Sequence, residues 1–289
     1  MTISAYRAFP RSNYDMDDIL NVTIVMSVYN GDEEQQLEEA VQSLLCQTIM
    51  PNEIVVVRDG PVSESIQKRI NSYKKDTRFK VIELEKNHGS ARARQAGIEA
   101  STNQIIALMD ADDICLVDRL EIQLTALEKS GCDVIGGQIE EFDVKIGDLG
   151  RRRVVPSSHE EIMMFSKWRN PITNVTLMFK KEAFFKSGGY ADTRLSEDWD
   201  FILKVIAAGF SVKNVSDTLV YVRSGDNMIA RRRRLTQVFT EIKLFWRMYN
   251  TGNMQFFPAF ANTIIRLVLR ALPRPVTTFL YTTVLRRNC

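Results

Sequence analysis

The stretch Ile105-Ile106-Ala107-Leu108-Met109-Asp110-Ala111-Asp112-Asp113 decides the fold of this chain. An apolar run of strand length stops abruptly at three carboxylates packed into four positions. A continuous apolar run is typical of a strand buried on both faces, and the polar residues mark the edge of the sheet. Because ligands of open α/β sheets bind beyond the carboxyl ends of the strands, the stretch predicts a ligand site at that edge.

The three aspartates at this edge repel one another unless a cation lies among them. Carboxylate oxygens suit Mg²⁺ or Mn²⁺, which can also bind the phosphates of a substrate. The alternative is a loop whose aspartates cap the helix that follows. Taken by itself, the stretch leaves both the metal site and the helix cap open.

The chain before and after this stretch repeats a strand followed by a helix. We expect strands at residues 22–30, 53–57, 79–84 and 105–109, and helices at residues 33–47, 63–75, 90–100 and up to Leu127. This alternation predicts a parallel sheet with right-handed crossovers, so that all four strands end at one edge. No G-x-G-x-x-G follows the first strand and no Walker A sequence occurs, which disfavours a Rossmann dehydrogenase and a P-loop enzyme.

The composition restricts the other classes of protein. The chain has 289 residues, enough for one large domain or for a domain with an appendage. Four scattered cysteines without a CxxC pair and only two histidines predict neither a zinc site nor a disulfide framework, and therefore a reducing compartment. Residues 1–21 lack the apolar core of a signal peptide, and no apolar stretch is long enough to predict a spanning helix.

A series of short motifs is similar to the signature of the family-2 glycosyltransferases over roughly residues 22–225. The motifs are Ser27-Val28-Tyr29-Asn30, Asp59-Gly60, Asn87-x-Gly89 with Ala93-Arg94-x-x-Gly97, Asp110-Ala111-Asp112-Asp113, Asn170-Pro171, Gly188-Gly189-Tyr190 and Ser196-Glu197-Asp198-Trp199-Asp200. One departure is Ser27, where many members have Pro or Thr. The resemblance implies a Rossmann-like GT-A fold of the α/β class, with a mostly parallel central sheet, that transfers a sugar with inversion from a nucleotide-diphosphate sugar, with UDP as the expected carrier.

By this resemblance, one set of side chains holds the donor. The expected contacts are Ser27, Tyr29, Asn30, Asp59, Asn87, Arg94, Asp110 and Arg231. Tyr29 would stack on the base and Asp59 would accept from a base N–H, whereas the alternatives are a packing ring and a turn residue. Asn30 also suits a cap of the following helix. Arg94 faces either the diphosphate or solvent, and Arg231 belongs to a basic segment that closes over the diphosphate in many relatives.

The resemblance also names the metal ligands and the catalytic base. Asp112 is the expected ligand of Mg²⁺ or Mn²⁺, with Asp110 beside it, and Asp113 is either a further ligand or the cap of the helix that ends at Leu127. The general base belongs to the acidic start of the later helix. We expect Asp198 to fill this role, with Glu197 and Asp200 as the other candidates, because spacing does not rank residues that point about 100° apart. Ser196 and these acids also suit a plain helix start.

The charge of the chain is unevenly distributed. Residues 231–289 hold eleven Lys or Arg and one acid, Glu241, whereas the rest of the chain is acidic overall. Residues 255–287 combine a broad apolar face with arginines at four-residue steps, which favours a helix on an anionic membrane surface over one that packs on the catalytic domain with its arginines in solvent. No nucleic-acid-reading module accompanies the basic residues, so a nucleic-acid partner is not expected.

These features predict three parts and one activity. The parts are an N-terminal extension (1–21), a GT-A domain (22–230) with a nucleotide-binding half (22–115) and an acceptor half (116–230), and a basic C-terminal helical segment (231–289). The predicted protein is a hexosyltransferase of cell-surface polysaccharide biosynthesis that is cytoplasmic, lies on the inner face of the membrane, and acts on a glycan or lipid-linked acceptor. The alternatives are a membrane-docked sugar-nucleotide binding protein without catalysis and a nucleotidyltransferase.

Overall fold

The structure is a computed structural model that describes residues 21–190, 196–224, 235–252, 254–272 and 287–288. The predictions for the N-terminal extension, for Arg231 and for residues 273–286 lie outside these ranges.

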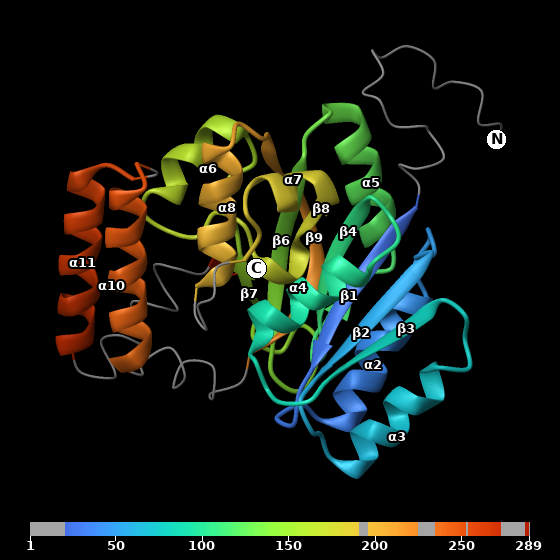
Figure 1. Cartoon of the computed structure of the whole chain (residues 1–289). Coiled ribbons are helices and arrows are strands. Elements are labelled where there is room, and N and C mark those ends of the chain that lie inside the picture. Colours follow the sequence, from blue (N-terminus) through green and yellow to red (C-terminus); the bar gives the residue numbers. More distant parts are fainter. Residues whose placement is uncertain (1–20, 191–195, 225–234, 253, 273–286, 289) are drawn as a thin grey trace.

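Four parallel strands form the first half of the sheet (Figure 1). They are β1 (Val22–Val28), β2 (Glu53–Asp59), β3 (Phe79–Leu84) and β4 (Ile105–Asp110). Their order is β3-β2-β1-β4, so β1 lies between β2 and β4 and pairs in parallel with both. The four predicted strands and their common edge are therefore confirmed.

The sheet continues beyond β4 with strands of both directions. These are β5 (Ile114–Cys115), β6 (Val134–Phe142), β7 (Arg151–Arg153), β8 (Met178–Lys180), β9 (Val212–Arg223) and β10 (Arg287–Asn288). The short β8 joins β4 to β6 by antiparallel pairs, and β9 runs parallel to β6 along most of its length. The long ladders are parallel and the short ones antiparallel, which confirms a mostly parallel central sheet in the described part of the chain.

Helices cover both faces of this sheet. One face carries α2 (Glu34–Leu45), α3 (Glu64–Tyr73) and α5 (Arg119–Ser130); the other carries α4 (Ser90–Ala100), α6 (His159–Ser166), α7 (Lys181–Lys186) and α8 (Glu197–Ala207). In β1, Ile24 and Met26 pack in the first core and Val25 in the second, as the alternation of a strand requires. Asp118 stands at the start of α5, so the prediction of Asp113 as a helix cap is wrong.

Two further helices, α10 (Leu235–Asn250) and α11 (Phe256–Ala271), lie side by side at one end of the molecule (Figure 1). Phe245 of α10 packs on Trp199 and Leu203 of α8 in a small apolar cluster of its own. Arg247 of α10 also forms an ion pair with Asp200 of α8 at 2.6 Å. The predicted C-terminal helices are thus present, and the first of them is anchored on α8.

Candidate active site

The first catalytic motif lies at the end of β4. Asp110 is the last residue of this strand and stands opposite Ser27 of β1 in the ladder. Its carboxylate accepts a hydrogen bond from Nη2 of Arg94 in α4 at 2.6 Å. The predicted donor contacts Ser27, Asp110 and Arg94 therefore come together at the sheet edge.

Arg94 connects this strand end with α8. Nη1 of Arg94 lies 3.4 Å from Oε1 of Glu197, and an Asn174 amide oxygen turned towards the guanidinium accepts from Nη1 at 2.8 Å and Nη2 at 3.0 Å. The side chain is buried, so the alternative of a solvent-facing arginine is wrong. Contact with a diphosphate stays a prediction for Arg94, whose guanidinium is bound by two carboxylates.

Glu197 is the partner of Arg94 at the start of α8. Ser90 of α4 donates its hydroxyl to Oε1 of Glu197 at 2.7 Å. Burial raises the pKa of Glu197 and the neighbouring Asp198 raises it further, while Arg94 and Ser90 act in the opposite direction. Glu197 therefore points inwards and holds the start of α8 against α4.

Asp198 and Asp200 are two residues apart in α8, so their side chains leave the helix in nearly opposite directions, about 200° apart, and have different surroundings. Oδ2 of Asp198 accepts from the side chain of Asn170 at 2.6 Å, and Oδ1 accepts from the Trp199 backbone at 2.9 Å. Asp200 is buried and paired with Lys204 at 3.1 Å and with Arg247. Of the three predicted base candidates, Asp198 is the partly exposed one, and Asp200 is directed towards α10.

The backbone before these acids is strained. Ser196 has φ of 60°, the left-handed region that side chains other than glycine rarely adopt. Ser196 occupies the predicted N-cap position of α8, but its side chain makes no capping hydrogen bond. A left-handed residue costs about 1–3 kcal/mol and persists where its surroundings hold it, a condition often found at active sites. Here the strained residue lies directly before Glu197 and Asp198.

The predicted base-binding residues lie at the ends of β1 and β2. The Tyr29 ring is exposed, as a stacking surface requires. Asp59 is buried and accepts from the backbone of His88 at 2.7 Å and of Gly89 at 2.9 Å, while Asn87 donates to its carbonyl oxygen at 3.3 Å. Asp59 thus connects the end of β2 with the loop before α4. Its role in the fold therefore extends beyond the turn at Gly60.

The turns around these strands leave little room. Gly60 has φ of +84°, and a Cβ at this position would lie 2.5 Å from the Asn87 backbone nitrogen. Asn30 is exposed, and Glu33 stands at the start of α2 without a side-chain cap. The interpretation of Asn30 as a cap is therefore wrong, and its contact with the donor stays a prediction.

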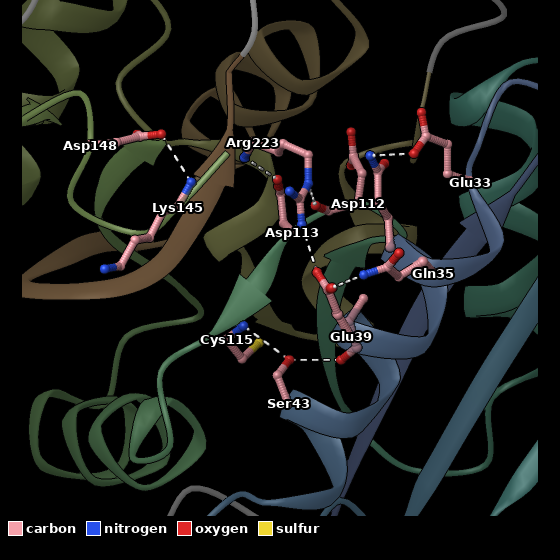
Figure 2. A network of polar contacts seen from close by, with 12 residues as sticks. Glu33, Gln35, Glu39, Ser43, Asp112, Asp113, Cys115, Lys145, Asp148 and Arg223 are labelled. Atoms are coloured by element: carbon pink, nitrogen blue, oxygen red, sulfur yellow. Dashed lines mark hydrogen bonds and ion pairs between the residues drawn. The ribbon is translucent and has the colours of Figure 1, made fainter. Parts of the chain in front are cut away.

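Asp113 and Arg223 form a network that sequence reasoning missed (Figure 2). Asp113 is buried and accepts from the Arg223 backbone at 2.8 Å, while Nε of Arg223 donates to the carbonyl oxygen of Asp112 at 3.1 Å. Nη2 of Arg223 donates to Glu39 of α2 at 2.8 Å, and the guanidinium lies over the Phe142 ring. Burial raises the pKa of Asp113 well above its usual value, and Asp112 and Asp110 raise it further.

The carboxylates at this edge of the sheet suit a metal site that is completed by water and substrate. In the ranges that the structure describes, no three His, Cys, Asp or Glu side chains converge as a metal cage. Asp113 is engaged with Arg223, which leaves Asp112 and Asp110, both partly exposed, as oxygen donors. Two carboxylates fit a Mg²⁺ or Mn²⁺ ion that completes its coordination with water and substrate phosphates. The metal and its ligands stay predictions.

Several residues of the site carry no signal in the sequence. Ser90, Asn174 and Arg223 bind partners that are 107, about 80 and 110 residues away in the chain. Their types are common on any protein surface, so only the three-dimensional structure identifies them. The motif residues, in contrast, were found because several of them occur in a fixed order.

Solved structures of two glycosyltransferases are similar to this one. Staphylococcus aureus TarS 1–349 in complex with UDP-GlcNAc has a TM-score of 0.61 at 17% identity, over 80% of this chain and 67% of that chain. Mannosyltransferase PcManGT from Pyrobaculum calidifontis, in complex with GDP-Man and Mn²⁺, has a TM-score of 0.58 at 17% identity, over 91% and 79%. The chain spans 46% of the longer TarS chain. These similarities show the GT-A fold.

Relatives found by sequence are also glycosyltransferases by name, and their identity to this chain is higher. An uncharacterized glycosyltransferase of Haemophilus influenzae is 34% identical over 93% of this chain and 100% of its own. The amylovoran biosynthesis glycosyltransferase AmsE of Erwinia amylovora is 32% identical over 90% and 97%. The UDP-Gal:α-D-GlcNAc-diphosphoundecaprenol β-1,3-galactosyltransferase of Escherichia coli is 30% identical over 94% and 98%. A family model described as glycosyl transferase family 2 matches residues 23–192, and the chain therefore belongs to this family of glycosyltransferases.

Proposed function

We propose that this glycosyltransferase moves a sugar from a UDP-sugar to a lipid-linked saccharide, with inversion and with Mg²⁺ or Mn²⁺, in cell-surface polysaccharide biosynthesis. The name of the E. coli relative describes a UDP-sugar donor and a diphosphoundecaprenol-linked acceptor, and that of the E. amylovora relative describes polysaccharide biosynthesis. Nothing found favours the two alternatives, a binding protein without catalysis or a nucleotidyltransferase.

One observation carries the proposal. The guanidinium of Arg94 contacts both Asp110, at the end of the donor-side strand β4, and Glu197, beside the candidate base Asp198. A transferase needs its donor phosphate site and its acceptor base at opposite sides of one reacting carbon. In this chain the side chain of Arg94 brings the two motifs together, although Glu197 lies 103 residues after Arg94 in the sequence.

The proposed donor site belongs to residues 22–115. Tyr29 stacks on the base, and Asp59 accepts from a base N–H, since each of its oxygens can take a second hydrogen bond. Asn30, Asn87 and Ser27 line the nucleotide, and Arg231, which lies outside the described residues, would bind the diphosphate. Residues 116–230 form the acceptor half.

Asp112 and Asp110 would hold the metal ion together with the donor diphosphate. The ion would offset the negative charge that builds on the departing diphosphate. Arg94 keeps Asp110 in place for this role. Asp113 holds the loop through Arg223, and its role as a further ligand stays a prediction.

Asp198 would act as the general base. Its two present hydrogen bonds, from Asn170 and from the Trp199 backbone, hold the carboxylate in one orientation and leave further lone pairs for an acceptor hydroxyl. The hydroxyl proton passes to Asp198, the acceptor oxygen bonds to the anomeric carbon, and the bond from that carbon to the diphosphate oxygen breaks. Because attack and departure occur on opposite faces, the configuration inverts.

The test combines ligand binding with transfer. Thermal unfolding is measured with UDP, GDP, dTDP and CMP, each with and without Mn²⁺, since a ligand of the folded state raises the melting temperature. We expect the largest shift with UDP and Mn²⁺ in the wild type, and loss of the metal-dependent part in Asp112→Ala. A matched control is Asp148→Ala, which removes an exposed aspartate of the loop after β6. Unchanged sugar transfer in Asp112→Ala would contradict the proposal.

A further inference from the structure

The outer face of α11 is apolar and uncovered in the described part of the chain. We define this face by six side chains that are 44–70% exposed: Phe256, Phe257, Phe260, Ile264, Leu267 and Val268. At 100° per residue, they fall within an arc of about 120° on one side of the helix. A soluble monomer rarely leaves such a continuous apolar surface in water.

The charged residues of this helix do not border the outer face in the way the sequence suggests. Arg266 points to the opposite side, where Nε lies 2.7 Å from Glu241 of α10 and the guanidinium lies near the Phe245 ring. The alternative with the arginines in solvent is therefore wrong for Arg266, and Arg266 does not belong to an arginine stripe that faces away from the protein. Glu241 is the one acidic residue among residues 231–289, and this ion pair neutralises it.

Aromatic rings extend the outer face towards the candidate base. Phe257 packs edge-on against Trp168 at 6.5 Å between ring centres, and Phe256 contacts Tyr249 and Trp246 of α10. Asn262 of α11 donates to the Lys167 carbonyl oxygen at 2.7 Å. Lys167 and Trp168 lie three and two residues before Asn170, whose amide donates to Asp198. The helix is thus fastened to the loop that positions the base.

We propose that the outer face of α11 docks on an anionic phospholipid bilayer, with its phenylalanines at the level of the acyl-chain boundary. Apolar side chains beside a Trp and Tyr cluster suit the interface of a bilayer. The interface with a protein partner would have a polar rim, whereas residues 256–272 contain no acidic residue. Residues 231–289 together carry ten net positive charges, which complement anionic headgroups. None of the helices in the described ranges is both long enough and apolar enough to cross a bilayer.

Docking in this way has a consequence for catalysis, which rests on the proposed function. A saccharide linked to a lipid diphosphate is anchored at the same boundary. The loop from Lys167 to Asn170, which contacts both α11 and Asp198, then lies between the bilayer and the base. The acceptor hydroxyl can reach Asp198 while its lipid stays in the membrane.

The experiment uses the full chain and vesicles of phosphatidylglycerol with phosphatidylethanolamine, compared with pure phosphatidylcholine. The test variant is Phe260→Ser with Val268→Ser. Its matched control is Phe185→Ser with Val144→Ser, which removes the same residue types where they are exposed elsewhere; Phe185 and Phe260 are each 48% exposed. We expect the wild type and the control to sediment with anionic vesicles, and the test variant to bind at least about tenfold more weakly.

Further readouts separate the possible failures. Emission of Trp168 and Trp246 should shift to the blue on anionic vesicles in the wild type and not in the test variant. Equal vesicle binding by the test variant and the control would overturn the proposal, as would a wild type that ignores anionic vesicles. A stable dimer that the test variant abolishes would assign the surface to a second copy instead. Sugar transfer to a water-soluble acceptor tests the proposed function separately, because it should persist in the test variant.

Discussion

Replacing Arg94 by Met tests whether one buried cation holds the two motifs together. The arginine side chain is 7% exposed, and its partners Glu197 and Asp110 are 11% and 32% exposed. Breaking a buried ion pair by removing one partner costs about 3–5 kcal/mol, because the other charge is left uncompensated. Asp110 regains water and Glu197 can take up a proton, so both costs are reduced. We expect Arg94→Met to lower the free energy of unfolding by about 2–4 kcal/mol.

The assay is urea unfolding, with Arg69→Met as the matched control. Arg69 of α3 also binds two carboxylates, Glu34 and Glu38 of α2, but this group of side chains is much more exposed. Exposed pairs contribute about 0–1 kcal/mol. The two variants therefore remove the same number of ion pairs, and only the buried one should be strongly destabilising. Transfer activity should fall by about 100-fold in Arg94→Met, because both motifs lose their common support.

A double-mutant cycle separates this reasoning from a general packing defect. Glu197→Gln keeps the acceptor atom for Ser90 and removes the charge opposite Arg94. If the two side chains stabilise each other, the effects of Arg94→Met and Glu197→Gln should deviate from additivity by about 1–3 kcal/mol. Strict additivity, or a loss in Arg94→Met no larger than that in Arg69→Met, would refute the role of Arg94 as the connecting cation.

Three further outcomes follow from the contacts of α8. The fold raises the pKa of Glu197, so the folded chain keeps this proton to higher pH than the unfolded chain. The free energy of unfolding relative to Glu197→Gln should therefore fall as the pH rises above the ordinary glutamate pKa. Urea unfolding curves measure it, and a free energy that rises with pH would contradict the reasoning. Asn170→Ala removes the side-chain donor to Asp198, and steady-state kinetics should show kcat reduced by about 10–100-fold with the donor KM unchanged. Arg247→Met leaves the buried Asp200 with Lys204 alone, and should lower the free energy of unfolding by about 1–2 kcal/mol with little effect on donor binding.

The parallel half of the fold was predictable because its signals are local. Residues 105–109 are apolar at five successive positions, and the structure extends this strand by one residue, to Asp110. Alternation of strand and helix then fixes the common edge at which Asp59 and Asp110 lie. The order of the motifs supplied the family, which the relatives confirm. Pattern and order therefore led to the right sheet edge without any knowledge of distances.

The second half of the sheet and the side-chain contacts were not predictable in this way. The short β8 joins β4 to β6 through three residues, too few for a periodic pattern. Asp113 has the same chemistry as Asp112, but it turns inwards because the Arg223 backbone, 110 residues later, meets it. Arg266 belongs to a regular spacing of arginines, and only the position of Glu241 decides that it faces α10. Partners that are distant in the chain decide these directions.

The first turn of α8 shows how one acidic cluster serves three different purposes. Successive helical residues point about 100° apart, so acids that are adjacent in the sequence cannot share one target. Glu197 faces Arg94 on the donor side, Asp198 faces Asn170 on the acceptor side, and Asp200 faces Arg247 of α10. The strained Ser196, with φ of 60°, stands at the start of this turn. A variant that rotates this helix start should therefore disturb donor, acceptor and C-terminal contacts together, whereas replacement of any one acid should break only the hydrogen bonds and ion pairs of that acid.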